Sequence, residues 1–445
     1  MERRMNGNNL AQLSAYYGLK KVKKWGGCIS SSLFLAVFFL LSTLFYAQPG
    51  YAELELHISK TSNDGIPIYI ANINGGASGI IEADLKRSGR FTIIERDKIN
   101  HLPAYGTPLN GGSYQEIADY ILRGKAQADG SLDVELVSTS DNARTEYHIS
   151  PNTNPRRVAH KAADSIYQKI TRQKGAFDTR LAYVTVTNKA NSNRRFRLYV
   201  ADSDGYNAQS ILTSREPIMS PSWSPDGTQL AYVSYERGNS AIYIQNIFTG
   251  EKRLISGREG INTAPDWSPD GTRMAMSLSV NGNPDIYVMN LKSGALTQVT
   301  DDRAIDTEPT WNGTQSLVFT SNRGGSPQLY RIAATGGNAQ RITFEGKYNS
   351  AADIAEKKIT YITGNRGAFH VAIQSLQSSG RDILSNGQLD ESPTLAPNGT
   401  MVVYSTLRSG QNALAVVSDN GKAKQFLRTP AGDVREPAWS SYLYQ

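Results

Sequence analysis

Four glutamates beside prolines are the residues whose chemistry could define a site. Glu216, Glu308 and Glu436 stand directly before a proline, and Glu391 stands one residue further away. Carboxylates gathered at one opening could hold a cation or act in acid–base catalysis. They could equally form a polar rim for a protein partner, or be solvated loop residues without a role. The sequence leaves these four interpretations open and favours the partner rim.

Other signals of catalysis or metal binding are not found in the sequence. The histidines form no HxH or HExxH pattern, and there is no GxSxG turn and no Gly-rich phosphate loop. Asp226 and Asp270, in two SPDG segments, are interpreted as turn residues. We therefore expect no catalytic residue, no metal and no cofactor. The histidines are His57, His101, His148, His160 and His370.

A repeat of about 44 residues fills the second half of the chain. WSPDG begins at Trp223 and again at Trp267, and Trp311 follows at the same spacing. The register continues through a degenerate copy near Ile354 and through LAPNG at 395–399. Each full copy has a proline, a tight turn and three further short apolar runs. Four short strands in a period of about 44 residues are typical of a β-propeller blade.

The two ends of the repeat region are out of phase. Residues 181–213 contain the second, third and fourth strands of a blade, and the C-terminal PAWSSYL contains only a first strand. Pairing the last strand with the first three would close the ring and remove exposed edges. The sequence therefore predicts six blades over residues 175–445, closed by the C-terminal strand. An open β solenoid is the alternative, and it does not explain the phase shift.

The segment before the repeats predicts a smaller α/β domain over residues 53–174. Its expected strands are 65–73, RFTIIE, YILRGKAQ and LDVELVST, and a helix over IIEADLKR ends before Gly89. Two further helices are expected, around 114–119 and over 155–171. The fold class is thus mainly β, a propeller preceded by a small α/β domain.

Residues 1–52 have the three parts of a secretory leader. A lysine cluster at 20–24 precedes an uncharged apolar run over 33–46, and small residues lead to Ala52. We predict cleavage between Ala52 and Glu53, export from the cytoplasm and no membrane span after processing. The run is short for a retained anchor. Cys28 lies before it, which argues against lipidation.

Charge gives little reason to expect a nucleic-acid partner. The whole chain carries +7, but residues 1–52 hold six of its 47 basic and one of its 40 acidic side chains. The remaining 41 basic and 39 acidic residues leave a near-neutral body, whereas nucleic-acid binding needs concentrated positive charge.

Several longer stretches together resemble the TolB family, periplasmic propeller proteins of the Tol–Pal envelope system. They are REPIMSPSWSPDG (215–227), DIYVMNLKSGALTQVTD (285–301), DTEPTW (306–311), LDESPTLAPNGTMVVYS (389–405) and the terminal EPAWSSYL. The likeness covers residues 53–445. Ile261 departs from the histidine of relatives.

The resemblance implies binding rather than catalysis. Such proteins bind the lipoprotein Pal at the propeller mouth and the C-terminal domain of TolA through the mature N-terminus. The TolA segment would be residues 53–63, beginning Glu53, Leu54, Glu55, Leu56, His57 and Ile58. The Pal face would comprise Met219, Asn262, Ala264, Thr307, Glu308, Asn349, Asp390, Glu391 and Arg435.

The implied role is support of outer-membrane integrity and of constriction during cell division, in the periplasm. Other outer-membrane or peptidoglycan-associated proteins are further candidate partners. The alternative function is a secreted propeller carbohydrate-active enzyme that uses acids of the channel, or a propeller that binds a small ligand.

Overall fold

The computed structural model describes residues 56–58, 65–187, 193–365 and 367–443. The predicted leader, its cleavage point at Ala52–Glu53 and the start of the predicted TolA segment lie outside these residues. No helix among the described residues has the length and apolar character needed to cross a membrane.

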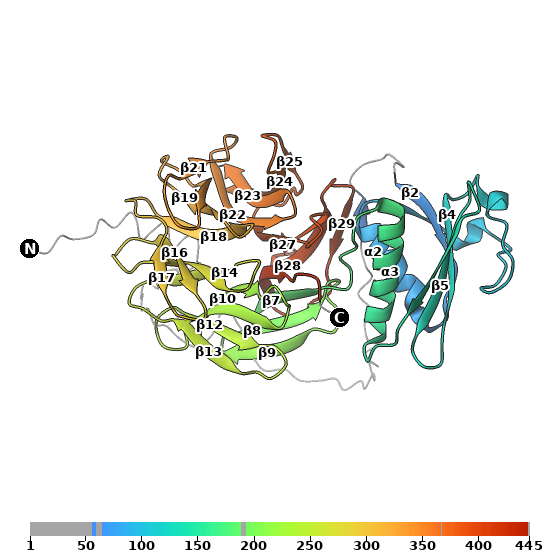
Figure 1. Cartoon of the computed structure of the whole chain (residues 1–445), viewed down its shortest axis with the longest axis horizontal. Coiled ribbons are helices and arrows are strands. Elements are labelled where there is room, and N and C mark those ends of the chain that lie inside the picture. The colour runs from blue at the N-terminus through green and yellow to red at the C-terminus, as the bar shows by residue number, and fades with distance from the viewer. Residues whose placement is uncertain (1–55, 59–64, 188–192, 366, 444–445) are drawn as a thin grey trace, which may run out of the picture. The chain divides into compact units, whose positions relative to one another are not determined.

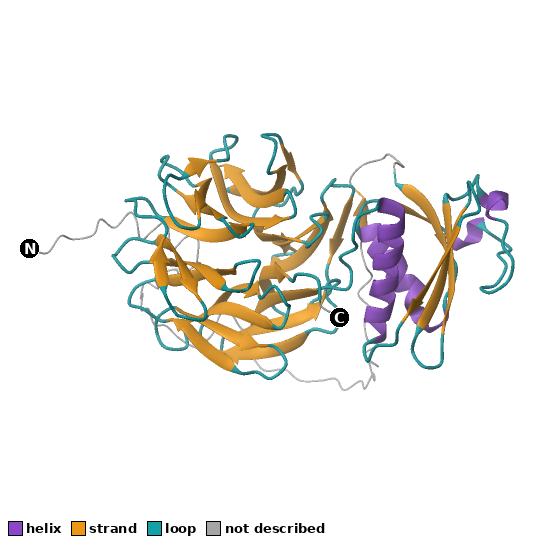
Figure 2. Ribbon diagram, in the orientation of Figure 1, coloured by secondary structure: helices purple, strands orange, loops and turns teal. Residues whose placement is uncertain are grey.

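Strands dominate the described chain, and they form six blades and one separate sheet (Figure 1). Both α-helices belong to the N-terminal α/β part, as the purple ribbons in Figure 2 show. The predicted fold class, a six-bladed propeller after a smaller α/β domain, is confirmed. We number the blades from the one that contains both ends of the propeller.

Each blade is an antiparallel sheet in which the first strand lies beside the central channel and the last strand lies at the outside of the ring. Blade 1 contains β30 (Asp433–Trp439), β7 (Arg180–Thr187), β8 (Arg195–Asp202) and β9 (Gln209–Ser214). Blade 2 contains β10 (Ile218–Trp223), β11 (Gln229–Ser234), β12 (Ala241–Asn246) and β13 (Lys252–Ser256). Blade 3 contains β14 (Asn262–Trp267), β15 (Arg273–Leu278), β16 (Asp285–Asn290) and β17 (Leu296–Gln298).

The remaining three blades follow the same order along the chain. Blade 4 contains β18 (Asp306–Asn312), β19 (Ser316–Ser321), β20 (Gln328–Ala333) and β21 (Gln340–Arg341). Blade 5 contains β22 (Tyr348–Ala355), β23 (Lys358–Asn365), β24 (Ala368–Ser375) and β25 (Arg381–Ile383). Blade 6 contains β26 (Glu391–Leu395), β27 (Met401–Arg408), β28 (Gln411–Ser418) and β29 (Ala423–Phe426), and β1 (Leu56–Ile58) lies beside β29.

The middle strands are apolar along their length because neighbouring blades cover both of their faces. In β11, Leu230 and Tyr232 pack in the cluster shared with blade 1, whereas Ala231 and Val233 pack in the cluster shared with blade 3. A strand buried on both faces needs no polar alternation. This explains why the repeats read as short apolar runs.

The SPDG turns close the first hairpin of a blade, as the sequence predicts. Asp226 Oδ1 accepts hydrogen bonds from Ser224 Oγ at 2.5 Å and from the Thr228 backbone N–H at 3.0 Å. Gly227 has φ +67, a conformation that L residues rarely adopt. The aspartates therefore have a structural role in the turn.

The ring closes through β30, which pairs antiparallel with β7. The phase shift between the two ends of the repeat region is thus explained as predicted. Trp439 is buried at the end of β30, where its indole N–H donates to Thr179 Oγ1 at 2.8 Å and its backbone N–H donates to Thr394 Oγ1 of blade 6 at 3.1 Å.

The α/β domain is a five-stranded mixed sheet in the order β3-β2-β4-β5-β6, covered on one face by two helices. β2 pairs parallel with β3 and β4, and β4, β5 and β6 are antiparallel. The bounds are β2 (Ile66–Ile70), α2 (Ala77–Arg87), β3 (Phe91–Ile94), β4 (Tyr120–Ala126), β5 (Leu132–Ser138), β6 (Arg144–Ile149) and α3 (Pro155–Thr171).

One predicted helix is wrong. Around 114–119 the chain forms only the end of a 3₁₀ helix, Gly111–Tyr114, and a turn before β4. The Asn142 side chain accepts the Gly111 N–H at 2.6 Å, and Ala118 makes a single helical bond to Tyr114 before the strand begins. Tertiary contacts therefore decide this segment. Strand β6 was not expected, because its side chains are mostly polar and exposed.

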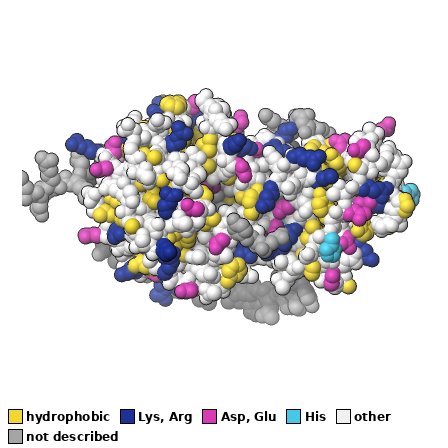
Figure 3. Space-filling model, viewed as in Figure 1, with side chains coloured by type: hydrophobic (Ala, Val, Ile, Leu, Met, Phe, Trp, Pro, Cys, Tyr) yellow, Lys and Arg dark blue, Asp and Glu magenta, His cyan; other side chains and the backbone are white. Residues whose placement is uncertain are grey.

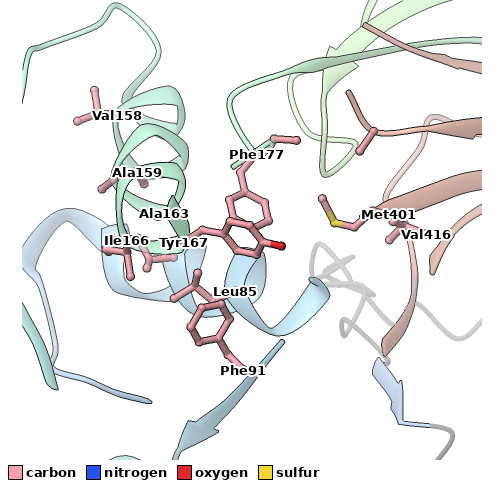
Figure 4. Close-up of a cluster of buried hydrophobic side chains, with 14 of the residues drawn as sticks. Leu85, Phe91, Val158, Ala159, Ala163, Ile166, Tyr167, Phe177, Met401 and Val416 are labelled. Atoms are coloured by element: carbon pink, nitrogen blue, oxygen red, sulfur yellow. The ribbon is translucent and has the colours of Figure 1, made fainter. Parts of the chain in front are cut away.

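The hydrophobic core of the α/β domain continues into the propeller. Figure 4 shows Tyr167 of α3 beside Phe177, with Met401 of blade 6 in the same cluster. Tyr167 and Phe177 meet edge to face, with ring centroids 5.6 Å apart. Shared burial of this kind couples the unfolding of the two parts.

We predict that Trp439→Ala lowers the free energy of unfolding by about 3–5 kcal/mol, because it removes a large buried side chain from the closing strand. Urea denaturation measures the change, with far-UV circular dichroism as the signal, because the substitution removes a tryptophan and would alter fluorescence. Phe248→Ala is the control, since that ring is 67% exposed. A loss at Trp439 no larger than at Phe248 would contradict the importance of closure.

Candidate functional site at the propeller mouth

The first strands of all six blades line a central cavity of about 510 Å³. We call the end at which these strands begin the mouth. Each first strand contains an irregularity in its register. At each one, a non-glycine residue has a left-handed backbone with φ between 48° and 54°. These residues are Ser220, Ala264, Glu308, Ala351, Ser392 and Glu436. Such strain persists only where the surrounding structure enforces it.

Two glutamates at these positions accept hydrogen bonds from the neighbouring blade. Glu308 Oε2 accepts the backbone N–H of Ala351, in the next blade, at 2.9 Å and Thr320 Oγ1 at 2.8 Å. Glu436 Oε2 accepts the backbone N–H of Ser220, also in the next blade, in a close contact. In both cases the carboxylate satisfies the N–H of a left-handed residue.

The four glutamates beside prolines therefore do not occupy equivalent positions in the structure. Glu308 and Glu436 share one structural position. Glu391 lies one residue earlier in its blade and is exposed, and Glu216 lies four residues earlier and is exposed. Two of the acids thus bond to neighbouring blades, and two are exposed at the surface.

A second set of channel side chains lies two residues after the left-handed residue of each first strand. Asp266 Oδ2 accepts the Trp311 backbone N–H at 3.0 Å, and Asp353 Oδ2 accepts that of Leu395 at 2.7 Å. Thr394 continues the pattern by accepting the N–H of Trp439 at 3.1 Å. Each group bonds to the next blade, so the channel acids have a structural role that repeat spacing alone did not reveal.

These channel carboxylates hold their protons unusually strongly. Burial raises the pKa of Asp266 to about 7, against the lowering effect of the Trp311 N–H. Burial likewise raises the pKa of Glu436 to about 7, and the charges of Glu391 and Glu308 add to the rise. Both side chains keep some contact with the channel.

The predicted TolA segment contributes one described element. Residues Leu56–Ile58 form β1, which pairs antiparallel with Ala423–Gln425 of β29. This strand is the fifth of blade 6, so it joins the propeller and not the sheet of the α/β domain.

Known proteins match this chain across both of its parts. A family model described as "TolB beta propeller domain" matches residues 167–443, and one described as "TolB amino-terminal domain" matches residues 54–139. This chain belongs to the TolB family.

Individual TolB proteins support the assignment. The Tol-Pal system protein TolB of Xylella fastidiosa is 46% identical over 387 residues, and that of Xanthomonas oryzae pv. oryzae is 48% identical over 377 residues. Each comparison covers 82% of this chain and 86% of the relative. The crystal structure of TolB from Acinetobacter baumannii matches with a TM-score of 0.80 and 35% identity, over 88% of this chain and all of that one.

The residues predicted for the Pal face of this TolB-family chain lie at the mouth ends of first strands. Between them they come from all six blades. Met219 is in blade 2, Asn262 and Ala264 in blade 3, Thr307 and Glu308 in blade 4, Asn349 in blade 5, Asp390 and Glu391 in blade 6, and Arg435 in blade 1.

Three of these side chains are buried and satisfied inside the protein. Asn262 Oδ1 accepts Ser256 Oγ at 2.6 Å, and Asn349 Nδ2 donates to Gln328 Oε1 at 2.8 Å. Asp390 Oδ1 accepts Thr406 Oγ1 at 2.5 Å. Their side chains hold the mouth loops in position, so any effect on a partner would be transmitted through those loops.

Sequence reasoning missed that these residues belong to a repeated set. Four blades place Asn or Asp two residues before the left-handed residue of the first strand, whereas blade 1 has Val434 and blade 2 has Ile218 there. The four polar members are Asn262, Asp306, Asn349 and Asp390, and all are buried. The signal was present in the aligned repeats as a polar residue three positions before the blade proline or its substitute.

The described residues offer no catalytic histidine to the alternative function, an enzyme that uses acids of the channel. His370 lies in β24, the third strand of blade 5, and is half-buried. On the face drawn in Figure 3, basic and acidic side chains are interspersed rather than gathered into one strongly charged patch.

We predict that Glu436→Gln stabilises the protein at high pH. The raised pKa means that the folded protein retains a proton that the unfolded chain has lost, so stability falls as pH rises from about 4.5 to about 7. Gln keeps an acceptor for Ser220 without ionising. Because channel water screens the group, we expect a gain of about 1 kcal/mol at pH 8 that disappears at pH 4.

Chemical denaturation at the two pH values measures this difference. Glu251→Gln, which removes an exposed carboxylate in the turn between β12 and β13, is the control for the loss of one acidic side chain. An equal effect of Glu436→Gln at pH 4 and pH 8 would show that the carboxylate ionises normally in the folded protein.

Proposed function

We propose that this chain is a non-catalytic binding protein of the Tol–Pal system, exported to the periplasm by cleavage after Ala52. In this proposal its propeller mouth binds the lipoprotein Pal and its mature N-terminus binds TolA. The connection supports outer-membrane integrity and constriction during division. Membership of the TolB family supports the assignment to the system.

The observation that carries the Pal site is the geometry of the mouth. Nine predicted residues from six blades lie at the same end of the first strands, although the sequence separates them by up to 216 positions. Exposed Glu391 and half-buried Arg435 offer both signs of charge there. The channel acids Asp266 and Asp353 are engaged with backbone N–H groups, so they have a role other than chemistry.

The position of β1 supports a coupling between Pal binding and TolA binding, which we call the handoff. Of the described residues before the α/β domain, three pair with β29, and a short edge strand adds little stability by itself. Binding of Pal would change how readily this segment leaves blade 6 and becomes available to TolA. Pal must then have different affinities for the two states, since a ligand shifts an equilibrium only by that difference.

We predict that Arg435→Ala and Glu391→Ala each weaken Pal binding about tenfold, since truncated central contacts typically cost 1–2 kcal/mol. Titration calorimetry with purified Pal measures the affinity. Glu308→Ala is unsuitable, because it removes a bond between blades and could unfold the ring. Glu308→Gln keeps an acceptor and serves in its place.

The matched control is Lys292→Ala, an exposed residue in the turn between β16 and β17, at the far end of the blade from the mouth. It should leave Pal affinity unchanged. Equal weakening by Lys292→Ala, or no binding by the folded wild type, would overturn the mouth as the Pal site and return weight to a small-ligand propeller.

A second prediction concerns the N-terminus. Deleting residues 53–58 should abolish TolA binding while Pal still binds. With the segment present, saturating Pal should change TolA affinity by the same factor by which TolA changes Pal affinity, because coupling between binding sites is reciprocal. Unchanged TolA affinity in the presence of Pal would contradict the handoff.

A further inference from the structure

A buried charge cluster joins the α/β domain to blade 1. Helix α2 contributes Asp84 and Arg87, and helix α3 contributes Arg156 and His160. The end of β8 and the turn after it, in the propeller, contribute Asp202, Ser203 and Asp204. The side chains of Asp84, Arg87 and His160 are each only 1% exposed, so their charges must be balanced locally.

His160 lies between two carboxylates that belong to different parts of the protein. Its Nδ1 is 2.6 Å from Asp84 Oδ2, within the α/β domain. Its Nε2 is 3.6 Å from Asp204 Oδ2, in the propeller. A neutral imidazole has a single N–H and would turn a lone pair toward one of these carboxylates, whereas the imidazolium presents an N–H to each, as a hydrogen bond to Asp84 and as a longer ionic contact with Asp204.

The arginines do not cancel the charge of the cluster by themselves. Arg87 Nη2 donates to Asp84 Oδ1 at 2.8 Å and contacts Ser203 Oγ at 3.3 Å. Arg156 makes a close contact with Asp204 Oδ2, and its Nε lies 3.9 Å from Asp202 Oδ2. Three carboxylates against two guanidinium groups leave one negative charge, which a protonated His160 cancels.

Other charged groups near His160 are already paired or bonded. One turn along α3, Asp164 accepts the backbone N–H groups of Phe177 and Asp178 at 2.7 and 3.0 Å. Arg157 forms a two-bond pair with Asp178. Arg180 is the remaining nearby cation, and it stacks 5.4 Å from the Phe248 ring.

We propose that His160 is a pH-dependent latch between the α/β domain and blade 1. In its doubly protonated form it ties Asp84 of the one to Asp204 of the other. Loss of the proton leaves a carboxylate facing an unprotonated nitrogen and loosens the contact. The proposal is independent of the proposed function, since it concerns only how the two parts of this chain are held together.

The direction of the titration agrees with this geometry. Burial alone lowers the pKa of His160, but the carboxylates of Asp84 and Asp204 outweigh it, and the pKa is raised above 6.5. The latch therefore contributes fully below about pH 6.5 and is lost as pH rises through the raised pKa.

A divalent cation would be a different use of the same residues. His160, Asp202 and Asp204 offer ligand atoms within 4.8 Å of one another. However, Arg156 already occupies these carboxylates, and a dication would leave the cluster positive. We therefore argue for the proton and treat the metal as an outcome of the test.

The test follows amide hydrogen exchange, corrected for intrinsic rates, in protein purified from cells that express the full chain. Between pH 6 and pH 9, protection in the turn at 202–206 and the first turn of α3 should fall about tenfold in the wild type. It should be independent of pH in His160→Gln. His148→Gln is the matched control, because His148 Nδ1 also contacts an aspartate, at 2.7 Å from Asp133 Oδ1, but is exposed and lies within one sheet.

A second measurement keeps the proposal falsifiable if His160→Gln does not fold. The imidazole signal of His160, identified by its loss or by elimination among the other histidines, should titrate above pH 6.5. Asp204→Asn, which removes only the propeller carboxylate, should lower its midpoint by about one pH unit. An unchanged midpoint in Asp204→Asn would overturn the latch.

Two further outcomes would also overturn it. One is an equal fall in protection in His160→Gln and the wild type. The other is a rise in protection at pH 7 when Zn²⁺ is added to the wild type but not to His160→Gln, which would make the cluster a metal site.

Discussion

The pairing of β30 with β7 is the constraint on which the propeller depends. It joins residues more than 240 positions apart and completes blade 1 with a strand from the far end of the chain, which closes the row of blades into a ring. Once the ring is closed, each blade can bond to the next around the channel, as Glu308 does to Ala351 and Glu436 to Ser220. The mouth exists as a single surface because of these bonds, since its residues come from separate repeats.

Closure of the ring also explains why acidic side chains are buried in the channel. Each first strand bends at a left-handed residue, whose N–H is lost from the regular ladder and needs an acceptor. A carboxylate from the preceding blade supplies it in two blades, and Asp266 and Asp353 supply the equivalent bond one step deeper. Burial raises the pKa of Asp266 and of Asp353, against the lowering effect of these N–H bonds; buried carboxyls with structural roles show such shifts as well as catalytic ones.

The α/β domain is held to the propeller by two different forces. Apolar contacts around Tyr167, Phe177 and Met401 bury hydrophobic surface, and their strength does not depend on pH. The ion cluster at His160 restricts the orientation of the two parts, because it places specific charges of α2 and α3 against one turn of blade 1. Hydrophobic burial therefore keeps the parts together, while the cluster selects how they meet.

The sequence by itself determined the blade count, the ring closure and the helix at 155–171, because strand period, turn residues and an amphipathic pattern are local signals. The residues of the predicted Pal face came from the resemblance to the TolB family, and in the structure they lie at the mouth ends of first strands from all six blades. Only the tertiary structure decided that Glu308 and Glu436 bond to neighbouring blades, that Asn262, Asn349 and Asp390 are buried, and that residues 114–119 do not form a helix. Those outcomes depend on contacts between segments far apart in the chain, and no local pattern encodes which side chain will find an unpaired backbone N–H.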